Sequence, residues 1–251
     1  MTTPEEVPEA EVPAESQLTG LWLAALTVWL GLVLPAVMAS AIGGGLPDPS
    51  AMWRFQDVWT AQVDRIMPYL VRLARRGWLR TAERLGVTLP WNPNDPELIE
   101  LIAQARNLLV RIPDSVYDQV VKAMVTGADR GETRAQIAQR VNNILSITGS
   151  ENWPHRASVI ARTELVRFTE AGGLAAARRI EIVEGSVIRK RWKDRDDANV
   201  RRAHARVDNQ LRRLGEPFEV GRSMLQHPVD PAGFPEDVIN CRCELEYVRG
   251  R

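Results

Sequence analysis

The sequence predicts an α+β protein in which an elongated all-helical N-terminal region precedes a small mixed α/β C-terminal module. Apolar residues recur at helical spacing over most of residues 51–183, after a long uncharged run. Beyond Gly185 the chain consists of short apolar pieces separated by turn residues, as in a small sheet with short helices. With 45% hydrophobic and 25% charged residues over 251 positions, the composition excludes a collagenous or wholly disordered chain.

Residues 1–20 are predicted to be an acidic, disordered tail. They include five glutamates and three prolines but no lysine or arginine. Acidic and basic residues balance at 32 each over the whole chain, which excludes a strongly basic nucleic-acid binder. Two alternatives stay open for the tail: a solvated end, or a segment that docks on a basic partner.

Residues 21–45 are predicted to form a hydrophobic helix that ends at Gly43–Gly45. No charged residue occurs from Ser16 to Pro47, and the run Leu21–Ile42 is long enough to span a bilayer. The acidic residues before it argue against a cleaved signal peptide. The same pattern fits a helix buried in the protein or in an oligomer interface, which we favour over membrane contact through Leu21–Ile42.

Residues 50–150 are predicted to be a helical region. Asp95-Pro96-Glu97 is a helix start, because proline suits the first turn and acids suit the positive end of the helix dipole. The helix over residues 51–85 is rich in arginine in its second half, which fits either a solvated face or contact with nucleic acid. The arginines assigned to DNA are Arg65, Arg72, Arg75 and Arg76.

Residues 151–251 are predicted to be the C-terminal domain. A helix is expected over 153–180 and a strand over 186–192. A further helix is expected over 198–214, followed by short strands at 217–220 and 238–248.

Both cysteines and two of the three histidines fall within forty residues of this domain: His204, His227, Cys241 and Cys243. On a strand, Cys-Arg-Cys points both sulfurs to one face, so imidazoles could complete a tetrahedral zinc site. A disulfide is disfavoured because an extended i, i+2 pair holds its Cα atoms near the upper limit for bridging. The alternative is two buried cysteines that act as small hydrophobic residues.

A polar cluster is expected to support these four residues. Asp197 and Arg201 are four positions apart, which predicts an ion pair on one helix face. Asp208 is expected to cap the turn after His204, and Asn240 directly precedes the first cysteine.

An ordered set of motifs resembles the Mu F-like minor head protein family of tailed phages over about residues 155–248. The set consists of Ala161-Arg162-Thr163-Glu164, Trp192, Asp197, Arg201, His204, Asp208, Phe218, His227-Pro228-Val229-Asp230-Pro231 and Ile239-Asn240-Cys241-Arg242-Cys243. Asn199 stands where the family often has arginine, and Asn209 replaces the glycine usual after Asp208. Because asparagine tolerates positive φ, the turn at Asn209 is expected to persist.

The resemblance implies a phage minor capsid protein inside the head. Its expected partners are the portal oligomer and other head proteins, and its expected roles are head morphogenesis and genome delivery after assembly in the host cytoplasm. The alternative is a thiol- or metal-dependent hydrolase, similar to a capsid maturation protease, that uses the His/Cys cluster. We favour the non-enzymatic role, because the sequence contains neither Gly-x-Ser-x-Gly nor His-Glu-x-x-His.

Overall fold

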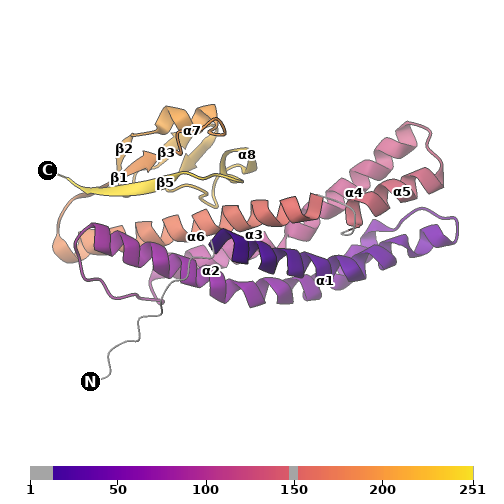
Figure 1. The fold of residues 1–251 in the computed structure, drawn as a ribbon, viewed down its shortest axis with the longest axis horizontal. Coiled ribbons are helices and arrows are strands. Elements are labelled where there is room, and N and C mark those ends of the chain that lie inside the picture. The colour runs from indigo at the N-terminus through magenta and orange to yellow at the C-terminus, as the bar shows by residue number, and fades with distance from the viewer. Residues whose placement is uncertain (1–13, 147–151, 251) are drawn as a thin grey trace, which may run out of the picture.

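A computed structural model describes residues 14–146 and 152–250 of the chain. Figure 1 shows an elongated helical bundle with the C-terminal module lying along α6 and the α4–α5 pair at the opposite end. The helices are α1 (Ala14–Ile42), the 3₁₀ helix η1 (Pro49–Phe55), α2 (Gln56–Arg84), α3 (Pro96–Val110), α4 (Ile112–Asp129), α5 (Arg134–Leu145) and α6 (Asn152–Glu184). The α+β fold class predicted from the sequence is confirmed.

The first helix begins earlier than the sequence predicted. α1 starts at Ala14, so the expected disordered tail is wrong for residues 14–20, and residues 1–13 lie outside the described part of the chain. Leu18 is fully buried in the bundle core, and the Glu15 carboxylate lies 2.7 Å from the Arg162 guanidinium of α6. These two contacts extend the helix beyond the uncharged run.

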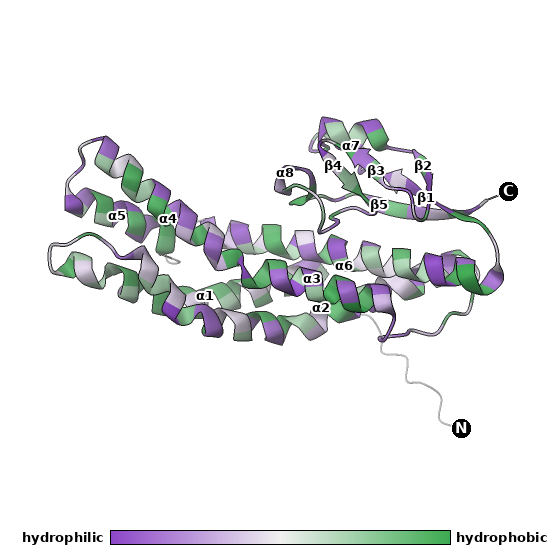
Figure 2. Cartoon of the chain, turned by 180° about the vertical axis from the view of Figure 1, so that it is seen from behind, coloured by the Kyte–Doolittle hydropathy of each residue, from purple (hydrophilic) through white to green (hydrophobic). Residues whose placement is uncertain are grey.

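The inner face of α1 belongs to the core of the bundle. Trp22 and Trp29 are fully buried, and their rings lie 6.2 and 5.7 Å from that of Trp59 on α2. By length and composition alone, α1 is also apolar enough to cross a membrane. Figure 2 shows hydrophobic and hydrophilic residues alternating around the bundle helices, as expected for helices with one buried face.

Helices α2 and α6 approach each other closely because glycines face the crossing. A Cβ atom on Gly77 would lie 1.9 Å from the Thr169 carbonyl oxygen, and one on Gly172 would lie 2.1 Å from that of Ala74. Both obstacles are backbone atoms of the facing helix, so neither can move aside. Only glycine fits at these two positions.

The C-terminal module contains a three-stranded antiparallel sheet of order β2-β1-β5 and a small hairpin, β3-β4. Its strands are β1 (Ile188–Lys193), β2 (Leu211–Arg213), β3 (Phe218–Val220), β4 (Ser223–Leu225) and β5 (Glu244–Arg249), and its short helices are α7 (Arg202–Val207) and α8 (Pro235–Val238).

The predicted helix over 198–214 is wrong, because a tight turn follows Val207. Asn209 has a φ of 62°, which confirms the expected positive-φ turn and directs the chain into β2. The backbone N–H of Asn209 donates to the Trp192 carbonyl oxygen at 2.8 Å, which holds this turn against β1.

Candidate metal centre

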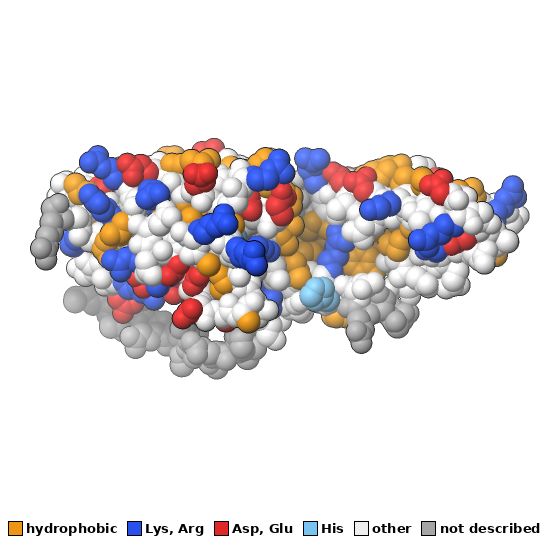
Figure 3. All heavy atoms as spheres, turned by 90° about the horizontal axis from the view of Figure 1, so that it is seen from above, with side chains coloured by type: hydrophobic (Ala, Val, Ile, Leu, Met, Phe, Trp, Pro, Cys, Tyr) orange, Lys and Arg blue, Asp and Glu red, His pale blue; other side chains and the backbone are white. Residues whose placement is uncertain are grey.

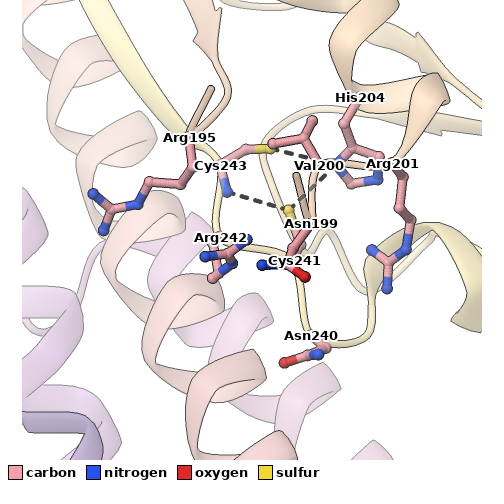
Figure 4. Close-up of a pocket in the computed structure, with 9 residues that line it drawn as sticks. All are labelled: Arg195, Asn199, Val200, Arg201, His204, Asn240, Cys241, Arg242 and Cys243. Carbon is pink, nitrogen blue, oxygen red and sulfur yellow. Dashed lines mark hydrogen bonds between the residues drawn. The ribbon is translucent and has the colours of Figure 1, made fainter. Parts of the chain in front are cut away.

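Three of the four predicted ligands meet in the module. His204 comes from α7, while Cys241 and Cys243 come from the segment between α8 and β5 (Figure 4). His204 Nδ1 lies 3.3 Å from Cys243 Sγ and 3.5 Å from Cys241 Sγ. All three side chains are buried, and both cysteines are free thiols.

The local backbone explains why both sulfurs face one imidazole. Residues 241–243 are not in a strand, contrary to the prediction, because β5 begins only at Glu244. Asn240 has a φ of 61°, which turns the chain sharply before Cys241. The backbone N–H of Cys243 then donates to Cys241 Sγ at 3.4 Å, so the two residues form a small loop around the sulfur.

The contact between the two thiols shifts their pKa values in opposite directions. The Cys243 thiol, which donates to Cys241 Sγ, lowers the pKa of Cys241 to about 5, and His204 adds to this effect. The same contact, together with burial, raises the pKa of Cys243. The cluster therefore presents two sulfur atoms and one imidazole nitrogen to a common point.

This donor set can hold a metal ion. The ligand atoms of His204, Cys241 and Cys243 all lie within 4.8 Å of one another. Zinc bonds of about 2.3 Å to sulfur and 2.0–2.1 Å to nitrogen separate two tetrahedral ligands by about 3.5 Å. The observed separations of 3.3 and 3.5 Å match that geometry.

A small cavity lies directly beside the cluster, and a second cavity of about 550 Å³ adjoins it. The small cavity measures about 20 Å³ and is lined by the three ligands and by six neighbours: Arg195, Asn199, Val200, Arg201, Asn240 and Arg242. A volume near 10–15 Å³ is what one water molecule needs. The small cavity therefore fits an ion or a water molecule, and the larger cavity shares Asn199, Arg201, Asn240 and Arg242 with its lining.

His227 is not brought into this group, so the predicted convergence of four residues is wrong for it. Val229 has a φ of 61°, and the Asp230 carboxylate accepts from the backbone N–H of Gln226 at 2.7 Å, which closes the loop after β4. His227 Nδ1 donates to the Pro228 carbonyl oxygen at 2.8 Å. Its side chain lines a pocket against α3 and α6, where burial lowers its pKa.

The supporting polar residues are paired differently from the prediction. No helix contains both Asp197 and Arg201, because α7 begins at Arg202. Asp197 instead accepts from Arg242 at 2.7 Å, and Arg201 donates to the Ile239 carbonyl oxygen. Asp208 does not cap α7 through its side chain but accepts from the backbone N–H of Asp194 at 2.9 Å.

Asn240 joins the cysteine segment to α6. Its side-chain oxygen accepts from Arg162 at 2.7 Å, and its backbone N–H donates to Thr163 Oγ1 at 3.0 Å. Sequence reasoning did not assign site roles to Arg162, Thr163 or Arg242. The sequence could have pointed to them, because they belong to the Ala161-Arg162-Thr163-Glu164 and Asn240-Cys241-Arg242-Cys243 motifs. Asn240 brings these two motifs into contact in the fold.

The comparisons agree with this architecture. The family described as phage Mu protein F like protein matches residues 117–246, which is just over half of the chain and runs from α4 into β5. The chain therefore belongs to that family, and it is a phage head-related protein whose place is the virion. Searches of the curated proteins and of the solved structures gave no match.

Proposed function

We propose that this protein is a minor capsid protein that binds the portal oligomer and acts in head morphogenesis and genome delivery after assembly in the host cytoplasm. The family match over residues 117–246 carries the proposal. It covers most of α4, all of α5 and α6, and the module as far as β5, so the shared unit is much longer than a short motif.

The outer face of α1 supports a role in assembly. Leu21, Val28 and Leu32 are each between 40% and 47% exposed, and no charged residue interrupts this face between Ser16 and Pro47. An uncharged helix face that exposes several large apolar side chains is a candidate contact surface. Because Trp22 and Trp29 fix the opposite face in the core, we favour a protein partner over membrane contact.

Binding to purified portal oligomer tests this role. We expect the full chain to co-sediment with the portal and the Val28→Glu variant to lose this binding, because the charge would be buried in the contact. Ile99→Glu is the matched control, since Ile99 is an exposed residue of α3, 53% accessible, away from α1. Equal binding by both variants would contradict the role of α1, and no binding by the wild type would contradict the portal proposal.

We also propose that α2 contacts packaged DNA. Arg65, Arg72 and Arg75 lie exposed on α2, and none of them forms an ion pair within the described chain. Each phosphate contact that is removed should lower the slope of log affinity against log salt by about 1. Arg72→Ala should show that loss in filter binding, whereas Arg222→Ala, on the hairpin of the module, should not.

Finally, we propose that the ion held by His204, Cys241 and Cys243 is zinc, with the fourth position taken by water or a partner. The soft thiolate ligands and the tetrahedral spacing support zinc. Elemental analysis should find about one zinc per chain in the wild type and in His155→Gln, an exposed control on α6. Cys243→Ser should lose the metal while remaining folded by circular dichroism. Full zinc content in Cys243→Ser would overturn the assignment.

A further inference from the structure

A groove of about 470 Å³ separates the helical bundle from the loop around α8. Its bundle wall consists of residues from the α3–α4 junction and from α6, and its other wall consists of residues 231–239 of the module. Figure 3 shows hydrophobic side chains gathered in the middle of this face, between the module and the α4–α5 end. The volume lies in the range of about 300–1,000 Å³ that is usual for binding pockets.

Most of the lining is apolar. Leu108, Ile112, Val159 and Ile160 line the bundle side, and Ile239, which is 42% exposed, lines the other. An apolar concave surface of this size is favourable for the side chains of a partner, because their burial removes apolar area from water. It does not specify the partner by itself.

Two buried charged side chains in the lining of the groove add specificity for a charged partner group. Glu164 and Arg167, both on α6, form an ion pair at 3.4 Å, and their side chains are 4% and 6% exposed. Arg167 Nε and Nη1 have no hydrogen-bond partner among the described residues, and neither does Glu164 Oε2. A buried donor without an acceptor costs about 1–3 kcal/mol, and more when it is charged.

The charge of the groove is positive. Its charged residues are Arg156, Arg167 and Glu164. Arg156 already donates to Ser115 Oγ, whereas Arg167 retains unmet donors. Glu164 is buried beside Arg167, and this burial raises the pKa of its carboxyl group. An acceptor that enters the groove therefore finds a desolvated guanidinium, with which charge-assisted hydrogen bonds are strong.

We propose that this groove binds a segment of another head protein that inserts apolar side chains and presents an acidic side chain to Arg167. The apolar walls favour the apolar side chains of such a segment, and the guanidinium donors of Arg167 that lack a partner favour its acidic side chain. This inference rests on the proposed function, since it names the surface through which the chain holds a partner in the head. An apolar pocket with one desolvated charged anchor is the arrangement typical of binding hot spots.

Photo-crosslinking in assembled heads tests the inference. A benzoylphenylalanine residue would replace Gln119, which lines the groove, or Gln139, a matched exposed glutamine of α5. We expect Gln119 alone to crosslink to a different head protein, at a peptide that contains apolar residues and Asp or Glu. Ile160→Trp, which fills the groove, should abolish this adduct, and Ile99→Trp should retain it.

Each outcome has a defined meaning. Absence of the chain from the heads would defeat the proposed function. Presence in the heads without an adduct from position 119, or with an adduct only to a second copy of this chain, would overturn the groove assignment alone.

A second measurement tests the anchor in the purified chain. The probe is 8-anilinonaphthalene-1-sulfonate, an apolar anion. We expect Arg167→Met to weaken the groove-specific binding, defined as the part lost in Ile160→Trp, by about tenfold. Unchanged binding in a folded Arg167→Met variant would overturn the role of the guanidinium. Groove binding of the dye without any protein adduct in heads would replace the protein partner with a small apolar acid.

Discussion

The bundle and the C-terminal module bury different kinds of side chain. Apart from Thr81, every buried polar or charged residue in the described chain lies at or beyond Thr163. The early helices pack tryptophan, leucine and valine around α1 and α2, whereas the module buries groups such as Lys190, His204 and Asp237. The helices before α6 are therefore held mainly by non-directional apolar packing, whereas α6 and the module add directional hydrogen bonds between buried groups.

This difference separates the roles of the two regions. The outer face of α1 leaves Leu21, Val28 and Leu32 exposed, and it is the surface that we propose for assembly. Directional bonds fix a few side chains in place, so the module can position a metal site. Ser223 illustrates this, since its hydroxyl donates to Asp237 at 2.6 Å and accepts from the backbone N–H of Phe234 at 2.9 Å.

The largest expected effect is a loss of stability when a side chain is added at the α2–α6 crossing. Gly172→Ala should lower the free energy of unfolding by about 3 kcal/mol or more, because the added Cβ would collide with the Ala74 carbonyl of α2. Urea unfolding measures it. Gly20→Ala is the control, since no atom lies within 4 Å of its added Cβ, and it should stabilise the helix by about 0.5–1 kcal/mol. Equal stability of the two variants would show that the crossing is looser than described.

The second-largest expected effect concerns Glu170 of α6, which contacts both α2 and β5 at the junction between the two regions. Burial raises the pKa of Glu170 on α6 from 4.5 to about 7, although Arg80 lies 3.0 Å away and the Leu245 N–H of β5 donates to it. Because the folded-state pKa is the higher one, this group stabilises the fold below pH 4.5, and that contribution is lost as the pH rises to about 7. The change amounts to about 3 kcal/mol.

Glu170→Gln should lack this loss between pH 5 and 7, so its unfolding midpoint should fall less than that of the wild type. Urea unfolding at both pH values measures the difference. Glu83→Gln, at an exposed position of α2, should retain the wild-type pH dependence. Identical pH profiles for Glu170→Gln and the wild type would refute the assignment of this pKa.

The smallest effect concerns the far end of the bundle. Thr133 caps α5 by accepting from the backbone N–H of Gln136, whose side-chain oxygen accepts from the Thr133 N–H at 2.8 Å. Thr133→Ala should cost about 1 kcal/mol, measured by thermal unfolding. Thr27→Ala, within α1 and exposed, should cost nothing, since alanine is the better helix former. A neutral Thr133→Ala would mean that packing alone holds this end.

The two regions also differed in how far the sequence predicted them. Helical periodicity located α2 to α6, and the Asp95-Pro96-Glu97 start is confirmed, because Asp95 caps α3 by accepting from the Glu97 N–H at 3.1 Å. In the module, the expected strands at 186–192 and 217–220 correspond to β1 and β3, whereas β2 and β4, of three residues each, are too short for an alternating pattern to define. Short-range rules therefore failed first in the module.

The candidate site was predicted only in part for the same reason. Motif order singled out His204, Cys241 and Cys243, which the fold brings together. The orientation of His227 depends on the positive φ of Val229. A valine in the sequence does not predict this left-handed conformation. Likewise, the Asp197–Arg242 pair joins positions forty-five residues apart, and local spacing favoured Arg201 instead. Non-local pairings of this kind follow from tertiary packing and cannot be read from spacing.

The most direct test of the account is crosslinking mass spectrometry of purified phage heads. The central claim is that this chain is a head protein bound to the portal. The account predicts peptides of this chain in the heads, with crosslinks from the bundle to the portal subunit. Heads that contain the portal but no peptide of this chain, or that contain the chain crosslinked only to tail proteins, would contradict it.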